Sequence, residues 1–383
     1  MSQRMILNET SYFGAGAIAN LVNEVKSRHL GKALVVTDKE LVKYQVVAKI
    51  TKLLDQHKMP YAVFDETVAN PTIEVVQKGI QAFKSEAANY IIAIGGGSPI
   101  DTAKAIGIII NNPEYADVRS LEGAVATANR SVPIIAIPTT AGTAAEVTIN
   151  YVITDAENKR KFVCVDPHDI PVVAIVDPDM MSSMPKSLTA ATGMDALTHA
   201  IEGYITKAAW ELTDMLHLKA IEIISRSLRG AVNNEPTGRE GMALGQYIAG
   251  MGFSNVGLGL VHGMAHPLGA FYDTPHGVAN AILLPTVMAY NADYTGEKYR
   301  DIAKAMSVPG TEAMSLQEAR SAAVAAVRQL SLDVGIPAHL REVGVREHDI
   351  PALAHSAFAD VCTGGNPRDT SITEIVELYR EIY

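Results

Sequence analysis

The sequence is poor in three features that would each indicate a particular class of protein. It has only 2 cysteines, Cys164 and Cys362, in 383 residues, which is too few for a disulfide framework or a thiolate zinc site. Its 32 basic residues against 42 acidic ones give a formal net charge of −10, which argues against a nucleic-acid binder or a protein of anionic membrane surfaces. No apolar run approaches the roughly 18–20 residues that a membrane span needs.

What the sequence does contain favours an acidic, globular protein of two domains. Hydrophobic residues make up 48% and charged residues 19%, a balance that excludes intrinsic disorder. A length of 383 residues is about two domains at the usual domain size. The first ten residues, MSQRMILNET, contain no apolar signal core, so we expect a cytoplasmic protein.

The first half of the sequence alternates short apolar runs with helical patterns. Such alternation predicts βαβ units with a parallel sheet between helices. The predicted strands cover residues 33–37, 61–64, 90–94 and 134–137, and helical patterns extend to His57, over 73–85 and up to Ile110. Residues 151–165 then predict an antiparallel hairpin, and 172–176 one more strand.

The composition changes near Pro178–Pro185, and after Leu188 only helical spacing is found. We therefore expect an α/β, Rossmann-like domain over residues 1–183 and an all-α domain over 184–383. The cleft between the domains is the expected place for metal and cofactor.

The helical half contains five side chains with metal-ligand chemistry. Asp195 and His199 are spaced i, i+4, and so are His262 and His266, with His276 following. Carboxylate and neutral imidazole are ligands for Zn²⁺ or Fe²⁺. Five ligands are too many if one coordination position must stay open for a substrate. One histidine would then support a ligand from outside the coordination sphere or relay a proton, although the spacing does not say which histidine this is. The alternative to a metal site is that these are ordinary polar histidines of the surface or the core.

Two segments of the first half are typical of phosphate-binding turns. The run Gly95–Asp101, GGGSPID, lies between a predicted strand and a helix, where glycines and free backbone N–H groups admit an anion. It is not the GxGxxG fingerprint, and a tight turn that binds nothing is the alternative. The run Pro138–Thr143, PTTAGT, offers three hydroxyls at a strand end, where helix capping is the alternative. Asp38 could accept hydrogen bonds from a ribose or cap a helix.

These segments together resemble the iron-dependent (group III) alcohol dehydrogenases. Asp177–Glu202 resembles the first metal signature of that family, and Gly257–Gly277 resembles the second. GGGSPID and PTTAGTAAE resemble its two nucleotide-binding stretches. Three further segments, NETSYFGAGA, EVTINYVITD and DVCTGGNPR, are similar to the members that act on lactaldehyde.

The resemblance implies a role for each candidate residue. The metal ligands would be Asp195, His199, His262 and His276, which leaves His266 as a catalytic histidine that is not a ligand. The cofactor-binding roles implied are a pyrophosphate site at Gly96, Gly97 and Ser98, a further cofactor contact at Asp101, a cofactor groove at Thr139, Thr140 and Thr143, a ribose contact at Asp38, and nicotinamide-side contacts at Asn150 and Lys161. Substrate contacts are implied at Phe253 and Cys362.

The activity that the resemblance implies is reversible hydride transfer between NAD(H) and a small aldehyde or diol, with lactaldehyde and 1,2-propanediol as the expected pair. Iron is the expected metal, with zinc as the alternative, and a homodimer is the expected assembly. Three other functions share parts of this pattern: a glycerol-dehydrogenase-like polyol oxidoreductase, a dehydroquinate-synthase-like lyase, and a non-enzymatic metal or nucleotide sensor. The helical half has no excess of basic residues to hold an anionic lyase substrate.

Overall fold

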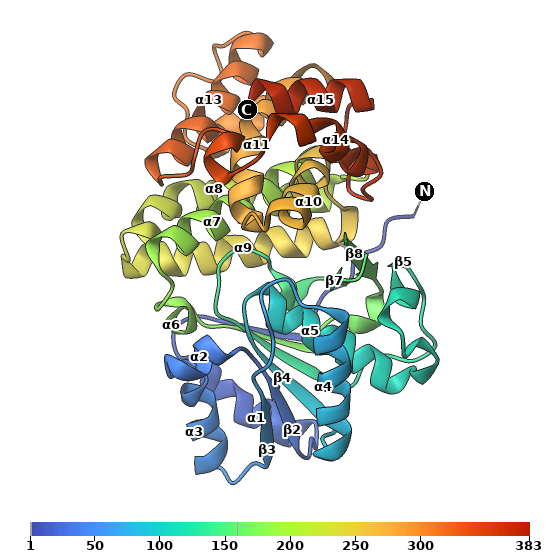
Figure 1. Cartoon of the computed structure of the whole chain (residues 1–383). Helices are drawn as coiled ribbons and strands as arrows, with labels where there is room; N and C mark the ends of the chain where they lie inside the picture. Colours follow the sequence, from blue (N-terminus) through green and yellow to red (C-terminus); the bar gives the residue numbers. More distant parts are fainter. Residues whose placement is uncertain (1, 159) are drawn as a thin grey trace. The chain divides into compact units, whose positions relative to one another are not determined.

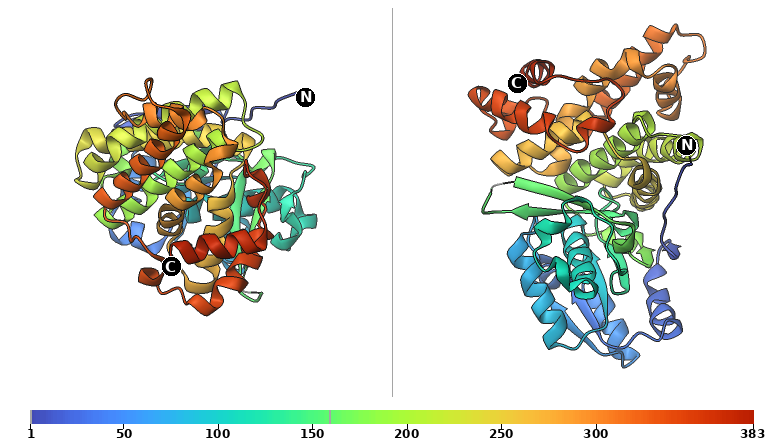
Figure 2. Two further views of the ribbon diagram at one scale, coloured as in Figure 1. Left: turned by 90° about the horizontal axis from the view of Figure 1, so that it is seen from above. Right: turned by 90° about the vertical axis from the view of Figure 1, so that its right-hand side faces the viewer.

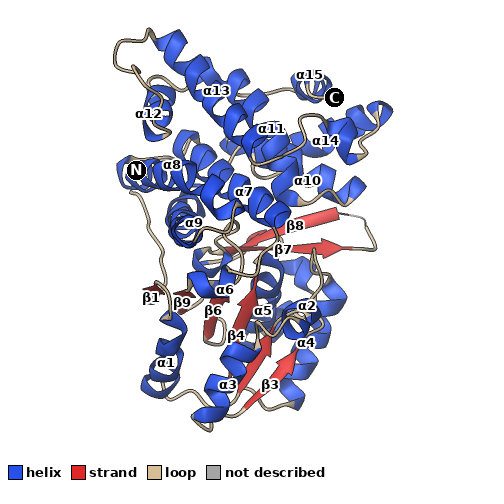
Figure 3. Ribbon diagram, turned by 90° about the vertical axis from the view of Figure 1, so that its left-hand side faces the viewer, coloured by secondary structure: helices blue, strands red, loops and turns tan. Residues whose placement is uncertain are grey.

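The chain folds into two compact units, Met1–Ser183 and Met184–Tyr383. The structure is a computed structural model and describes residues 2–158 and 160–383. Figure 3 shows that the labelled strands all lie in the first unit, whereas the second is built from helices. The predicted fold class, an α/β domain followed by an all-α domain, is confirmed.

The first unit is built on a parallel sheet. Among the described residues, six strands pair in parallel, in the order β1 (Thr10–Phe13), β9 (Val173–Val176), β6 (Ile134–Pro138), β4 (Tyr90–Gly95), β2 (Ala33–Val36) and β3 (Tyr61–Phe64). The inner strands β2, β4, β6 and β9 are buried along their whole length, because helices cover both faces of a parallel sheet. The predicted strands are confirmed; β1, an edge strand of half-exposed residues, gave no apolar run to predict it.

Helices pack on each face of this sheet (Figure 1). One apolar core lies under α4 (Ile73–Ser85) and α5 (Gly97–Asn111), and the other under α1 (Leu21–Ser27) and α3 (Ala48–Gln56). The prediction of one helical stretch up to His57 is wrong in one respect. The stretch is two helices, α2 (Lys39–Lys43) and α3, separated by a turn in which Gln45 has a φ of 61°, a left-handed conformation that no helix accommodates.

The predicted hairpin is confirmed by a second, small sheet, whose two longer strands are drawn as green arrows in Figure 2. Strand β7 (Asn150–Asp155) pairs antiparallel with β8 (Arg160–Val165), and the two-residue β5 (Gly123–Ala124) pairs with β8. A short helix, α6 (Pro178–Met181), follows β9 near the end of this unit.

The second unit is a bundle of helices. Its α-helices are α7 (Lys186–Ile205), α8 (Glu211–Val232), α9 (Pro236–Val256), α10 (Leu260–Tyr272), α11 (His276–Asn291), α12 (Lys298–Ala305), α13 (Leu316–Asp333), α14 (Ile350–Phe358) and α15 (Ile372–Glu381). Helix α7 is buried on almost every face, as expected for a helix at the centre of a bundle. Among the described residues, no helix is both long and apolar enough to cross a membrane.

Candidate functional site

Four of the five side chains with metal-ligand chemistry converge inside the helical unit. Asp195 and His199 lie on α7, His262 on α10, and His276 is the first residue of α11. One ligand atom from each lies within 4.8 Å of the other three. Asp195, His199 and His262 are at most 5% exposed, whereas the side chain of His276 is 34% exposed. His276 is therefore the member of the cluster nearest to solvent.

The carboxamide of Asn280 shows that this cluster suits a cation. Its Nδ2 lies 2.6 Å from Asp195 Oδ1 and 3.1 Å from the Nε2 atoms of His262 and His276. An amide group carries two hydrogens, so three acceptors converge on a donor that can satisfy only two of them. A divalent cation at their meeting point could be coordinated by all three. The donor set therefore fits a metal with nitrogen and oxygen ligands.

The surroundings of His262 keep its ring in the form that binds metal. Burial lowers the pKa of His262 well below its usual value, and the neighbouring histidines lower it further, so the imidazole is neutral. Its Nδ1 lies 2.6 Å from Glu202 Oε2, and the same carboxyl group accepts from the backbone N–H of Val261 at 2.6 Å. With Nδ1 occupied in this way, Nε2 is the atom that His262 presents to the cluster.

A close approach of two helices brings His276 to Asp195. A Cβ on Gly277 would lie 2.3 Å from the carbonyl oxygen of Ala191 and 3.3 Å from Asp195 Cβ. The first distance is far below any real contact between a methyl group and backbone. Only glycine therefore allows α11 to pack against α7 at the position of the ligands.

Gly277→Ala is expected to weaken metal binding about 10- to 100-fold, the usual cost of disturbing the support of a metal ligand. The added methyl group would force α11 away from α7 and separate His276 from Asp195. The dissociation constant for Fe²⁺ or Zn²⁺, measured by competition with a chelator, checks this. Gly364→Ala is the control, because a Cβ there meets nothing within 4 Å. An unchanged constant in Gly277→Ala would contradict the expectation.

The two predicted phosphate-binding segments lie side by side in the first unit. Strand β4 ends at Gly95, whose φ of 156° and whose closeness to Pro99 exclude a side chain, and β6 ends at Pro138. A Cβ on Gly96 would lie 3.1 Å from the Thr140 side chain. A Cβ on Gly97 would likewise lie 3.1 Å from the Thr143 side chain. The two turns therefore form one cradle with little room for further side chains.

Helix α5 begins in this cradle without a side-chain cap. Its N-cap is Gly96, and no described side chain accepts from the first-turn N–H groups. Free N–H groups and the positive end of the helix dipole make such a terminus a site for phosphate. Ser98 adds a hydroxyl to the first turn. The residues of this unit thus fit the pyrophosphate of a dinucleotide.

Two charged residues of α5 tie the cradle to strand β7. The carboxylate of Asp101 accepts from the backbone N–H of Val152 at 3.1 Å, and burial raises the pKa of Asp101 to about 7. The buried ammonium of Lys104 donates to the carbonyl oxygens of Thr148 at 2.7 Å and Asn150 at 2.9 Å. The structure thus places Asp101 against the protein backbone and connects the position of Asn150 to the helix that begins in the cradle.

Asp38, Thr139 and Lys161 lie in the same unit. Asp38 is the N-cap of α2 and accepts from the backbone N–H of Leu41 at 2.9 Å through Oδ1. Thr139, directly after β6, is buried, and its backbone N–H donates to the carbonyl oxygen of Gly95. Lys161, on β8, donates to Asn70 Oδ1 at 2.7 Å. Asp38 therefore caps a helix through Oδ1.

The remaining predicted site residues surround the ligand cluster in the helical unit. The ring of Phe253 stacks on that of His199, with centroids 4.2 Å apart. His266 stands outside the cluster of four and bonds through Nδ1 to Asp360 Oδ2 at 2.8 Å. Cys362 follows in the same loop as Asp360, and burial raises the pKa of its thiol well above the usual value. That thiol is therefore protonated at neutral pH.

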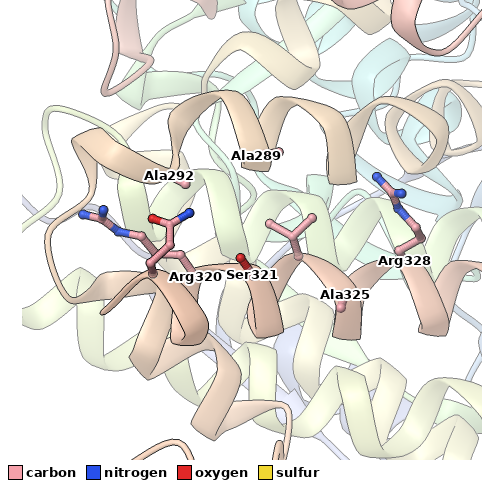
Figure 4. A pocket seen from close by; sticks show the side chains of 8 residues that line it. Ala289, Ala292, Arg320, Ser321, Ala325 and Arg328 are labelled. Atoms are coloured by element: carbon pink, nitrogen blue, oxygen red, sulfur yellow. The ribbon is translucent and has the colours of Figure 1, made fainter. Parts of the chain in front are cut away.

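A groove elsewhere in the helical unit contains none of the predicted site residues. Figure 4 shows it along α13, with Ala289 and Ala292 opposite. Its volume is about 310 Å³, and its polar residues include Arg320 and Arg328. Arg320 is already paired with Asp293 at 2.8 Å. The groove is separate from the ligand cluster.

Sequence reasoning missed several supporting residues, and helical spacing could have found two of them. Glu202 stands seven positions after Asp195 on α7, which places it on the same helical face, and Asn280 stands four positions after His276 on α11. Asp360 and Gly277 gave no such signal, because their roles depend on contacts between different helices.

Comparison with known proteins agrees with these sites. Residues 8–178 match the family described as iron-containing alcohol dehydrogenase, and residues 189–383 match the C-terminal region of the same family. The chain is 68% identical over 379 residues to lactaldehyde reductase of Escherichia coli strain K12, covering 99% of both chains. It is 43% identical to 1,3-propanediol dehydrogenase of Citrobacter freundii, covering 100% of both.

A solved structure, that of a 1,3-propanediol oxidoreductase, superimposes with a TM-score of 0.97 at 42% identity and covers 100% of both chains. Family matches over both units, together with relatives of this identity and coverage, identify the chain. It belongs to the iron-containing alcohol dehydrogenases, oxidoreductases that work with NAD and a divalent metal.

Proposed function

We propose that this protein interconverts lactaldehyde and 1,2-propanediol with NAD(H). The convergence of Asp195, His199, His262 and His276 carries the proposal, because a carboxylate with three imidazoles is a ligand set for a catalytic divalent metal. The choice of substrate rests on the 68% identity to lactaldehyde reductase. A homodimer in the cytoplasm is part of the same proposal and rests on the resemblance to the family.

In the helical unit, the four cluster residues would hold the metal, with Fe²⁺ as the first choice and Zn²⁺ as the alternative. When bound, the metal supplies the positive charge that stabilises the carbonyl oxygen of the aldehyde as negative charge develops there, while NADH supplies the hydride. Phe253, stacked on His199, excludes water from that side of the cluster, and Cys362 offers a neutral thiol to the substrate.

The reduced product needs a proton at its oxygen, and His266 is placed to provide it. Its ring stacks on that of His276, with centroids 5.4 Å apart, so it lies beside the cluster without belonging to it. With Nδ1 bonded to Asp360, Nε2 is the atom that exchanges the proton. Histidine is the side chain that enzymes use most often for such a proton transfer.

In the first unit, the cradle would bind the cofactor. The backbone N–H groups of Gly96, Gly97 and Ser98 bind the pyrophosphate, with Asp101 anchoring the first turn of α5 from behind. Thr139, Thr140 and Thr143 line the groove, Asn150 and Lys161 lie toward the nicotinamide, and Asp38 binds the adenosine ribose through Oδ2.

The substrate is tested by following NADH oxidation with a panel of carbonyl compounds. We expect the highest kcat/KM with lactaldehyde or glycolaldehyde, in protein purified without oxygen and loaded with Fe²⁺. Dihydroxyacetone as the best substrate would favour a glycerol-dehydrogenase-like enzyme. No NADH oxidation with any aldehyde, while metal and NADH still bind, would favour a sensor and overturn the proposal.

Two histidine substitutions separate metal binding from proton transfer. His262→Ala is expected to lose both the metal and turnover while still binding NADH, because it removes a ligand of the cluster. His266→Ala is expected to keep the metal and lose rate by about 100-fold or more, the usual contribution of a general acid. Metal content and kcat of both variants check this, with the exposed His355→Ala as control. Full metal content in His262→Ala would remove that residue from the ligands.

The choice of NAD over NADP is expected to depend on Asp38. A 2′-phosphate beside this carboxylate would place like charges together, and the neighbouring Lys39 lacks the planar fork that arginine offers to phosphate. Asp38→Gly should raise kcat/KM for NADPH by about two orders of magnitude, roughly 2–3 kcal/mol of relieved repulsion. The helix should survive, since glycine costs only a few tenths of a kcal/mol at an N-cap.

The control for Asp38→Gly is Asp117→Gly, which removes another N-cap carboxylate of the same unit. It should leave the ratio of NADH to NADPH efficiencies unchanged. If Asp38→Gly also left the ratio of NADH to NADPH efficiencies unchanged, Asp38 would serve only as a helix cap.

A further inference from the structure

We infer that Asp360 is a positioning residue that holds the imidazole of His266 in one orientation and one tautomer. The inference rests on the proton role proposed above for His266. Asp360 lies in the loop between α14 and the short 3₁₀ helix Thr363–Gly365, 94 positions from His266 in the sequence.

The pair is a short hydrogen bond in a largely dry environment. His266 Nδ1 lies 2.8 Å from Asp360 Oδ2, and the two side chains are 15% and 16% exposed. A carboxylate only accepts, so Nδ1 must carry the hydrogen. In the neutral ring this leaves the lone pair on Nε2, the other ring nitrogen, which accepts a proton from solvent before passing it to the product oxygen.

The surroundings keep Asp360 ionised and therefore an acceptor. Burial by itself would raise the pKa of its carboxyl group, but the nearby imidazole of His266 and the bonds from His266 and Cys362 outweigh it and lower the pKa below its usual value. Oδ1 accepts from the backbone N–H of Cys362 at 2.9 Å. Both oxygens are thus engaged, and the carboxylate cannot turn without losing a bond.

The loop that carries Asp360 is itself fixed on α10, the helix of His266. Thr363 Oγ1 donates to the carbonyl oxygen of Ala357 at 2.7 Å. The same oxygen would lie only 2.1 Å from a Cβ atom placed on Gly263. A glycine at 263 therefore lets the loop rest directly on α10. The Oδ1 of Asn366 accepts from the backbone N–H of Leu260 at 3.3 Å, which ties the other end of the loop to the start of the same helix.

The ring that Asp360 holds faces two members of the ligand cluster. It stacks on His276 at an interplanar angle of 13° and meets the edge of His262 with centroids 6.1 Å apart. A ring flip about the Cβ–Cγ bond would exchange Nδ1 with Cδ2 and Nε2 with Cε1, so that a carbon would face Asp360 and another carbon would replace Nε2 beside the substrate. A fixed acceptor at Nδ1 opposes this flip, and Asp360 is that acceptor.

Asp360→Asn tests the inference in the iron-loaded enzyme. An asparagine can donate as well as accept, so it no longer selects one tautomer. We expect kcat with lactaldehyde to fall about 10- to 100-fold, as for other residues that orient a working histidine, with little change in KM, metal content or NADH binding. Asp360→Glu, which keeps the carboxylate, should recover part of the lost rate.

The same substitution in the His266→Ala background decides whether Asp360 acts through His266. The effects of substitutions at residues that act as a unit are not additive. Asp360→Asn should therefore cause no further loss of rate in the His266→Ala background. Single-turnover NADH oxidation with excess enzyme makes the residual rates measurable. The control is Asp349→Asn, because Asp349 Oδ2 accepts from Tyr272 on α10 at 2.5 Å and so joins the same parts of the chain without touching His266. It should leave kcat unchanged.

The outcomes separate this inference from the proposed function. If His266→Ala keeps the full rate, the proton role is wrong and this inference is wrong with it. If His266→Ala loses rate but Asp360→Asn does not, only the positioning inference is overturned. An equal loss from Asp360→Asn in both backgrounds, or an equal loss in Asp349→Asn, would show that Asp360 acts through the fold rather than through His266.

Discussion

The ligand cluster of the helical unit is built from acceptor atoms that face one another inside the protein. Asp195, His262 and His276 direct an oxygen and two nitrogens toward the same point, where Asn280 now donates its amide hydrogens. Buried acceptors that face each other are costly unless a positive group lies between them. Such an arrangement persists only because rigid helices impose it, and a divalent cation is the group that satisfies it fully.

The support of this cluster comes from backbone as much as from side chains. Gly277 lets α11 touch α7, and Glu202 receives both the His262 ring and the backbone N–H of Val261 at the start of α10. The buried carboxyl group of Glu202 thus bonds to the first turn of α10 and also orients His262, a metal-ligand candidate on that helix. In the loop after α14, Asp360 likewise makes two bonds. Its carboxylate accepts from the backbone N–H of Cys362, which closes a turn, and from His266.

The cradle of the first unit differs from the ligand cluster in its chemistry. The cradle offers backbone N–H groups and glycines instead of ionised side chains, and the charged residues of α5 turn away from it. Lys104 and Asp101 bond to the backbone around β7, and these bonds fix α5 against the hairpin. A phosphate would therefore meet a surface whose dipoles are already oriented, which is the condition for strong binding without a cationic side chain.

The sequence by itself determined the features that depend on neighbours along the chain. Alternating apolar runs predicted the parallel strands, and the i, i+4 spacing placed Asp195 beside His199 on α7. The glycine run before α5 marked its uncapped start. Each of these follows from the period of a helix or strand, which is local. The break between α2 and α3 escaped because a single left-handed residue, Gln45, leaves no mark in a hydrophobic pattern.

Only the tertiary structure decided which distant groups meet. Spacing along the sequence gave five ligand candidates, and the packing of α7, α10 and α11 brought four of them together. The fifth, His266, bonds to Asp360 instead. The sequence did not say whether Asp38 caps a helix, and the bond from the backbone N–H of Leu41 shows that it does. These outcomes depend on contacts between elements far apart in the chain, whose geometry arises from the close packing of the whole unit and from no single segment.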